Sequence, residues 1–392
     1  MIFLKALSYS TTLLIGLSAA TATAQSTMRI KALALGEKGV VEDIKPKDWS
    51  IKIGGKVTSV VSQRLPAELG KEGQKWAFVF LPVRDPETRK IAVQSVATFM
   101  STLPATDSAL IVIRNSNGLD CLTPGFTTRP SLWKNALGRV IKELPSRLDG
   151  NPSLAFTLPT SPEIEKEEDI EPIQAFLREL STEKVDRRAD DVTSKLTSIV
   201  DSYSIESLGG YAKTISRTLE SIEQMAETIS KVQGEKHFIV FSKCEIDDLS
   251  NPAWGRKVTQ MSSGGLKAME TNEVMASRDV LNSKLQTEMM IRDVTLARIS
   301  LSAKFAQLGL TLHSVGNPGA SFAGAFGEAA QASGGFQFRF DSNFVTRFCQ
   351  LLPLWATRYE LEVALPPEPG SPIKIVVETS RKKVQTYAPS AR

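Results

Sequence analysis

The side chains best suited to nucleophilic or metal chemistry are few in this chain, which has two histidines and three cysteines among 392 residues. Cys244 lies seven residues after His237, and a thiol beside an imidazole can act as a base-activated nucleophile. Nothing in the sequence indicates a third group that would orient such a base. A histidine at a strand end, like His237, or inside a strand, like His313, is typical of a structural core. We therefore expect no enzymatic activity, and a hydrolase of unrecognised type is the catalytic alternative.

The cysteines do not form a metal motif. Cys121, Cys244 and Cys349 are separated by 123 and 105 residues, spacings that match no zinc or redox pattern. We expect buried structural thiols with at most one disulfide. The chain also contains no G-x-S-x-G, H-E-x-x-H, G-x-x-x-x-G-K-[S/T] or G-x-G-x-x-G sequence, so the common hydrolase, zinc and nucleotide signatures are absent. We expect no cofactor.

Charged residues directly follow two apolar runs. Arg84 and Asp85 come after residues 76–81, and Lys243 and Glu245 come after residues 237–241. Continuous apolar runs of this length are typical of strands that are buried on both faces of a parallel sheet. Ligands of such sheets bind beyond the carboxyl ends of the strands. The residues that follow the strands are therefore the candidates for binding.

The elements around these runs alternate between strand and helix. A further apolar run at residues 109–113 predicts a second strand, and residues 310–315 predict another. Phe336, Phe338 and Phe340 alternate with polar residues as in an edge strand. Helical spacing of apolar residues predicts the intervening helices, at about 89–100, 131–143, 211–233, 291–308, 320–331 and 343–352. This order predicts an α/β fold with a doubly wound, mostly parallel sheet and helices on both faces.

Segments of different character flank and interrupt this pattern. Residues 1–24 resemble a signal peptide, with Lys5, an apolar stretch and an A-x-A site that ends at Ala24; a single membrane anchor is the alternative. Residues 25–70 and 354–392 predict short β segments that pair or pack beside the main domain, residues 71–353. Residues 145–206, rich in proline and acidic groups, predict a polar, partly helical insertion. We therefore expect a periplasmic or secreted protein with no membrane span after cleavage.

Composition excludes several classes of protein. Hydrophobic residues make up 42% and charged residues 23% of the chain, so collagen-like and disordered classes are excluded. The formal net charge is +4, too small a bias to indicate a nucleic-acid or anionic-membrane partner.

The order of short motifs resembles the VWFA-related secreted proteins common in acidobacteria, which contain a von Willebrand factor type A (vWA) domain. Residues 47–56 match the Asp-aromatic step before an extended stretch, and residues 99–111 match a helix that ends in phenylalanine before a second strand. Residues 126–137 match "f-T-x-d-r-x-x-L-x-x-A-L" and residues 329–338 match "lA-x-x-t-G-G-x-x-f". Tyr359 to Val377 matches the family's β tail. The resemblance covers nearly the whole mature chain except about 150–205.

The resemblance implies a metal-ion-dependent adhesion site (MIDAS), at which Asp-x-Ser-x-Ser, a Gly-Gly-Thr loop and a further Asp supply oxygen ligands to Mg²⁺. This chain departs from each ligand set. Pro82, Arg84 and Pro86 replace the first three side chains, and Tyr211 replaces the threonine. No aspartate occupies the first positions after residue 241. We therefore expect no metal, although Asp85 and Glu245 could serve as ligands after a shift of register.

The same positions suggest a different form of binding. Arg84 and Lys243 could replace the charge of the metal and contact an acidic group of a partner directly. We expect an adhesion or envelope-assembly module that binds an unidentified protein at the carboxyl edge of its sheet, without a metal; a metal-dependent vWA adhesion protein with shifted ligands is the alternative. The predicted binding residues are Arg84, Asp85, Thr127, Thr128, Tyr211, Lys243 and Glu245.

Overall fold

The computed structural model describes residues 27–37, 39–65, 73–83, 85–145, 152–159, 171–182, 205–242, 273–316, 325–365 and 374–390. The predicted signal peptide, Arg84, Lys243, Cys244 and Glu245 lie outside these ranges. None of the described helices is long and apolar enough to cross a membrane.

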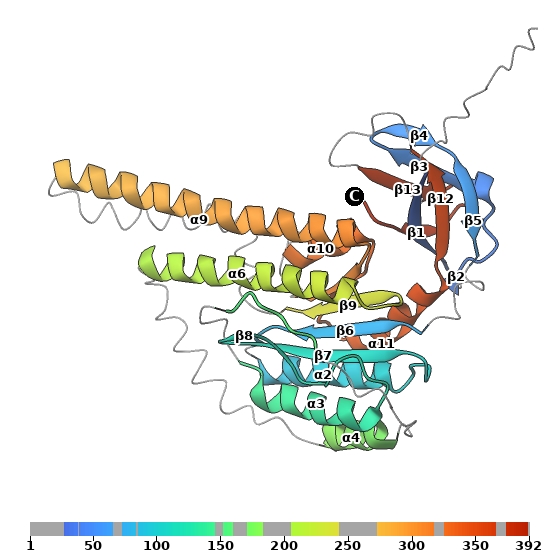
Figure 1. Cartoon of the computed structure of the whole chain (residues 1–392), viewed down its shortest axis with the longest axis horizontal. Helices are drawn as coiled ribbons and strands as arrows, with labels where there is room; N and C mark the ends of the chain where they lie inside the picture. The colour runs from blue at the N-terminus through green and yellow to red at the C-terminus, as the bar shows by residue number, and fades with distance from the viewer. Residues whose placement is uncertain are drawn as a thin grey trace, which may run out of the picture.

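A six-stranded sheet forms the centre of the molecule (Figure 1). Its strands lie in the order β11-β10-β9-β6-β7-β8, and all neighbours are parallel except β7 and β8. We call it the central sheet. It confirms the expected mixed α/β architecture with a mostly parallel sheet. Its strands are β6 (Lys75–Phe80), β7 (Ser108–Asn115), β8 (Gly118–Cys121), β9 (Lys236–Phe241), β10 (Thr311–Gly316) and β11 (Gln337–Arg339).

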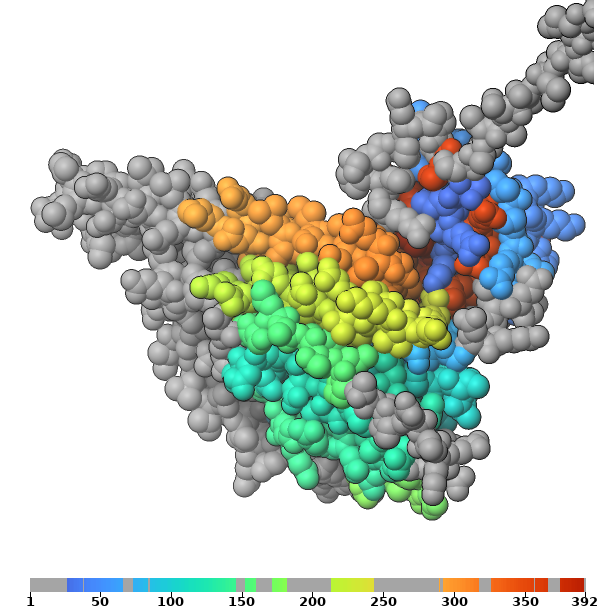
Figure 2. Space-filling view, viewed as in Figure 1, coloured from blue at the N-terminus to red at the C-terminus, as the bar shows by residue number. Residues whose placement is uncertain are grey.

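Helices cover both faces of the central sheet because its apolar residues alternate between two cores. Phe78 and Phe80 of β6 pack into one core, whereas Ala77 and Val79 pack into the other. The first core is covered by α2 (Pro86–Met100), α3 (Pro130–Glu143), α4 (Glu171–Thr182) and α11 (Phe344–Leu351). The second core is covered by α6 (Ile205–Ser230), α9 (Glu273–Leu308) and α10 (Ala325–Ser333). In Figure 2, α9 and α6 form adjacent bands over this second face.

Two helices differ from the sequence expectation. The long helix α9 begins well before the predicted start, and its amino-terminal part extends beyond α6 at the end of the molecule away from the chain's C-terminus (Figure 1). Gly309 ends it as expected, with a φ of 64°. Helix α4 lies within the predicted insertion, and its Ile173, Phe176 and Leu180 are buried against the first core, a contact that the polar composition of the segment did not indicate. Their spacing of three and four residues makes one apolar face.

Strands from both ends of the chain form a separate β-rich body, which we call the terminal β unit. One sheet has the order β14-β1-β12-β5, and β2 also pairs with β1. The other sheet has the order β13-β3-β4. Their apolar faces enclose a core that includes Ile30, Ile51 and Leu361. The strands are β1 (Thr27–Gly36), β2 (Gly39–Val40), β3 (Trp49–Ile53), β4 (Lys56–Thr58), β5 (Val60–Arg64), β12 (Tyr359–Ala364), β13 (Ile375–Thr379) and β14 (Gln385–Tyr387). Short helical turns η1 (Pro46–Asp48) and η2 (Leu352–Thr357) precede β3 and β12.

The terminal β unit contacts the amino end of the central sheet. Lys31 of β1 pairs with Glu235, directly before β9, and the Ser390 N–H donates to the Ala332 carbonyl oxygen at 3.2 Å. Gly334 lies so close to this unit that an added Cβ would be 2.7 Å from Pro389 N. We call this contact zone the seam.

Candidate functional site

The carboxyl end of the central sheet contains the point at which the strand order reverses. The chain passes from β6 to β7 and β8 on one side, and then returns to β9, β10 and β11 on the other side of β6. Crevices at such a reversal are the usual ligand sites of open parallel sheets. We call this region the rim and define it as residues 81–83 and Asp85 after β6, Ser242 after β9 and Gly316 at the end of β10.

The chain after β6 is held firmly by backbone contacts. The Leu81 N–H donates to the Phe241 oxygen at 3.0 Å, and the Val83 N–H donates to the Pro145 oxygen at 3.2 Å. Arg89 of α2 donates to the Val83 oxygen at 2.9 Å, and burial lowers the pKa of its guanidinium. Val83 is fully buried. This part of the rim is therefore a packed apolar turn, whereas a metal-binding loop would present oxygen atoms.

Asp85 caps α2. Its Oδ1 accepts the Glu87 N–H at 3.2 Å, and its Oδ2 accepts the Thr88 N–H at 3.2 Å and the Thr88 hydroxyl. Pro86 follows at the first helical position, where its missing N–H costs nothing. Both carboxylate oxygens are thus used to satisfy the amino end of the helix. Asp85 has a structural role at the rim, which the sequence D-P-E-T could have indicated.

We expect Asp85→Ala to lower the free energy of unfolding by about 1 kcal/mol, because two helix N–H groups lose their acceptor. Asp85→Asn, which keeps one carbonyl oxygen, should lose less. Urea denaturation of the three proteins measures the difference. An unchanged midpoint for Asp85→Ala would contradict the capping role.

Arg114, at the end of β7, is a buried cation that the sequence analysis did not single out. It is 1% exposed, and its Nε donates to Thr218 Oγ1 of α6 at 3.2 Å. In the sequence, Arg114 could have been noticed only as the single arginine that directly follows the apolar run of residues 109–113. On the neighbouring strand, the Ser242 N–H donates to the Val315 oxygen at 2.8 Å. Lys243 and Glu245 follow Ser242 in sequence, outside the described residues.

Thr127 and Thr128 do not belong to the rim, which corrects the sequence expectation. Thr127 pairs with Ala109 through two backbone hydrogen bonds of 2.9 and 3.0 Å. In the parallel register of β6 and β7, Ala109 pairs with Trp76 near the amino end. Ile113, four residues later, pairs with Phe80 at the carboxyl end of β6. The threonines therefore lie about 13 Å from the rim along the strands. The physical reason is that β8 runs antiparallel to β7 and returns the chain to the amino end of the sheet.

Thr127 instead positions the start of α3. Its hydroxyl accepts the Arg129 N–H at 3.1 Å, and its carbonyl oxygen accepts the Trp133 indole N–H at 3.0 Å. Tyr211 lies in α6, and its side chain is outside the described part of the structure. Of the seven predicted binding residues, the structure describes only the side chain of Asp85 at the rim.

No group of three or more histidine, cysteine or acidic residues gathers within the described ranges in a way that could hold a metal ion. Cys121 and Cys349 are free thiols. Burial raises the pKa of Cys121 to about 12 and that of Cys349 to about 11. Both are therefore protonated and unreactive at neutral pH.

Comparisons with known proteins add a distant likeness. No family model matches the chain, and no curated protein matches it. A solved structure of von Willebrand factor type A from Catenulispora acidiphila is 9% identical, with a TM-score of 0.34, and the alignment covers 92% of this chain and 71% of that one. The human COPII-coat protein Sec24c is 8% identical, with a TM-score of 0.31 and coverage of 81% and 44%. The strand order and register of the central sheet define the fold.

Proposed function

We propose that this chain is an exported protein-binding module of vWA type, which binds its partner at the rim without a metal ion. The observation that carries the proposal is the position of the terminal β unit. It contacts the amino end of the central sheet through the seam. The reversal of strand order lies at the opposite, carboxyl end, where parallel sheets bind their ligands.

The charges around the rim support an acidic partner. Arg84 and Lys243 follow β6 and β9, the two strands that flank the reversal. The carboxylate of Asp85, which lies between Arg84 and α2, accepts hydrogen bonds from the helix. A carboxylate on a partner would form charge-assisted hydrogen bonds with two cations at this position. The shifted-register metal site would need Asp85 to leave its capping role, which disfavours the metal-dependent alternative.

An apolar face on α9 adds a second contact surface. Met289, Leu296 and Ile299 are 61%, 54% and 55% exposed, and their spacing of seven and three residues places them on one side of the helix. Exposed apolar side chains that share a face are typical of protein interaction surfaces. We therefore expect the interface to combine a basic rim with an apolar helix face.

Charge reversal at the rim tests this proposal. We expect Arg84→Glu/Lys243→Glu to lose at least about 90% of the proteins that the wild-type chain captures from its native cell-envelope extract, because two attractive contacts become repulsive. The matched control is Lys47→Glu/Lys52→Glu, which makes the same change of charge on the terminal β unit. Quantitative mass spectrometry of the captured proteins is the measurement. Equal capture by the rim variant and the control would contradict the proposal.

The same capture separates the alternatives. We expect equal recovery with 1 mM EDTA and with 1 mM Mg²⁺, and loss of the partner in EDTA would support the metal-dependent alternative. The mature chain recovered from the extract should begin at Gln25, and an intact residue 1–24 segment would contradict the predicted cleavage and support the membrane-anchor alternative.

A further inference from the structure

A buried histidine pair lies at the amino end of the central sheet, next to the seam. His237 of β9 and His313 of β10 are both fully buried, and His313 Nε2 lies 3.4 Å from His237 Nδ1. The Phe336 N–H donates to His313 Nδ1 at 3.1 Å. The His237 ring stacks on Trp76 with a centroid distance of 4.3 Å. These contacts hold both rings in place.

The hydrogen bonds determine where the protons lie. His313 Nδ1 accepts the Phe336 N–H, so the proton of a neutral His313 is on Nε2. That N–H donates to His237 Nδ1, so the proton of His237 is on Nε2. His237 Nε2 is buried and has no hydrogen-bond partner among the described residues. A further proton can enter only at a nitrogen that already accepts an N–H, and it would break that hydrogen bond.

The charges that surround the pair disfavour a further proton. Burial is the largest cause of the lowered pKa of His237, followed by His313 and then by Arg358 and Lys31, which both approach from the side of the terminal β unit. Glu235 is the carboxylate between them: its Oε2 pairs with Arg358 Nη2 at 3.0 Å and with Lys31 Nζ. Burial lowers the pKa of His313 to about 3 and that of His237 well below its ordinary value. The titratable groups on the elements packed around the pair are Lys31, Lys75, Asp107, Glu235, Lys236 and Arg358.

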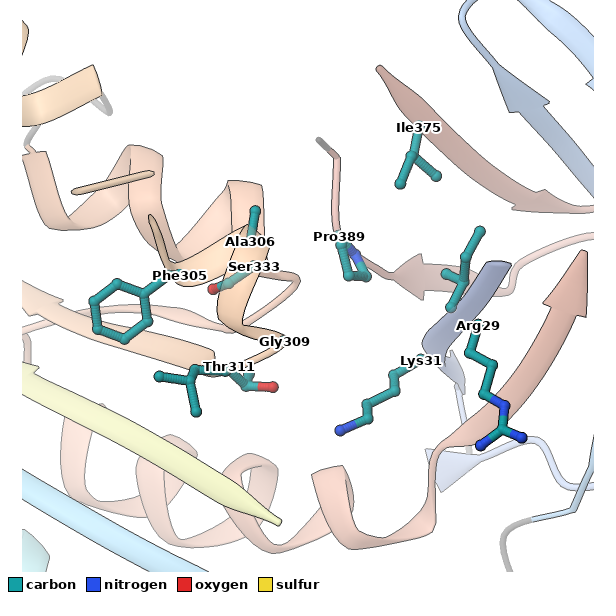
Figure 3. Close-up of a pocket in the computed structure, with 11 residues that line it drawn as sticks. Arg29, Lys31, Phe305, Ala306, Gly309, Thr311, Ser333, Ile375 and Pro389 are labelled. Carbon is teal, nitrogen blue, oxygen red and sulfur yellow. The ribbon is translucent and has the colours of Figure 1, made fainter. Parts of the chain in front are cut away.

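The seam beside the pair is incompletely packed. A cavity of about 50 Å³ lies between β1, the end of α9 and the start of β10, and the surface is notched between α9 and the terminal β unit (Figure 2). Figure 3 shows Lys31 on one wall of this cavity and Thr311 and Ala306 on the other. Arg358 is 6% exposed, and its Nε has no partner among the described residues. The seam therefore combines apolar contacts, such as that of Tyr387 with Phe336 at a ring-centroid distance of 5.0 Å, with a cavity and with the buried charges around Glu235.

We propose that the seam is an acid-sensitive joint: protonation of the His237–His313 pair favours separation of the terminal β unit from the central sheet. Separation exposes the rings to water and removes Lys31 and Arg358 from their vicinity. In the separated state, water can solvate the imidazolium and replace the hydrogen bond that protonation breaks. The joint couples the pH of the surroundings to the position of the terminal β unit, and this inference is independent of the proposed binding at the rim.

The direction and size of the effect follow from proton linkage. In the separated state the rings titrate near their ordinary pKa of about 6.5. In the joined state their pKa values are depressed, so the separated state binds more protons below pH 6.5. The joined state is fully favoured above that pH and is lost as the pH falls. Below pH 6.5, protonation of each ring shifts the equilibrium between the joined and separated states roughly tenfold per pH unit. The two rings together shift it roughly a hundredfold per pH unit.

Hydrogen exchange of the wild-type chain between pH 7 and pH 5, corrected for the intrinsic exchange rate, tests the joint. The reporter at the seam is the amide of Ser390, which donates to the Ala332 oxygen across it, and the reference amides are Val79 and Val240 in the middle of the central sheet. We expect protection at the seam to fall more than about tenfold while the reference amides keep theirs. Parallel loss at both places, or no loss at the seam, would overturn the proposal.

A paired variant assigns the effect to the histidines. His237→Asn/His313→Gln keeps an acceptor and a donor at the corresponding positions but removes both titrating groups. In this variant we expect the protection of the seam amide against hydrogen exchange to be independent of pH between 7 and 5. A pH dependence equal to that of the wild type would exclude the pair as the sensor. If the double variant does not fold, His313→Gln alone should reduce the change per pH unit from roughly a hundredfold to roughly tenfold.

Discussion

Gly335→Ala should destabilise the chain by at least about 3 kcal/mol, the upper part of the range for overpacking. Gly335 lies between α10 and β11, and an added Cβ would be 1.8 Å from the Leu312 carbonyl oxygen and 2.7 Å from its carbonyl carbon. These are backbone atoms of β10, so no side chain can rotate to make room. Either β10 or the start of β11 must move, and the parallel pairing of Ser314 with Gln337 is then lost. Urea denaturation followed by circular dichroism measures the change.

Gly138→Ala is the matched control for this prediction. Gly138 lies inside α3, and nothing is within 4 Å of the position that its Cβ would occupy. Alanine should therefore stabilise the chain by about 0.5–1 kcal/mol, because it restricts the unfolded chain and favours the helix. The two substitutions are chemically identical and should change the unfolding midpoint in opposite directions. A loss of stability below 1 kcal/mol for Gly335→Ala would show that the strands tolerate the contact.

Glu235→Ala should cost about 3–5 kcal/mol of unfolding free energy, the range for removing one partner of a buried ion pair. Arg358, whose side chain is 7% exposed, and Lys31, at 29%, would both lose their counter-charge. Lys31 can turn toward water, but Arg358 cannot, and it would remain charged beside the buried His237. Thermal and urea unfolding at pH 7.5 measure the loss.

Two controls separate the charge effect from general disruption. Glu37→Ala removes the same side chain from an exposed pair with Lys383, in which the side chains are 69% and 76% exposed, and it should change stability by less than about 0.5 kcal/mol. Glu235→Ala combined with Arg358→Met should recover most of the loss, because no unpaired guanidinium remains buried. If the double variant is as unstable as Glu235→Ala, packing and not charge explains the effect.

The central sheet was predictable because its strands carry an unambiguous pattern. Residues 76–81 and 238–241 are uninterrupted apolar runs, and the structure buries their side chains on both faces. The alternating phenylalanines near residue 338 correctly indicated an edge strand, β11. Helix ends that glycine marks were predicted well, as at Gly309. In each case the local pattern and the tertiary environment favour the same structure.

The site was less predictable because its geometry depends on pairings between distant residues. The short strand β8 has only four residues and no strong pattern, yet its antiparallel direction moves Thr127 and Thr128 to the opposite end of the sheet from the rim. Arg114 looks like a strand terminus in the sequence, and only the fold shows that it is buried under α6. The contact between Glu235 and Arg358 joins residues more than a hundred positions apart, and no local periodicity indicates such a pair.

The pairing of β1 with β12 has a consequence for the biosynthesis of this chain. Thr27 and Glu362 are hydrogen-bonded neighbours, although 335 positions separate them. At typical elongation rates a ribosome needs roughly 20–60 s to make that distance. During this interval β1 exposes an unpaired edge with alternating apolar residues, which is the form that aggregates or binds holding chaperones. A stalled or truncated product that ends before residue 359 never completes this β body and is a natural substrate for quality-control proteases.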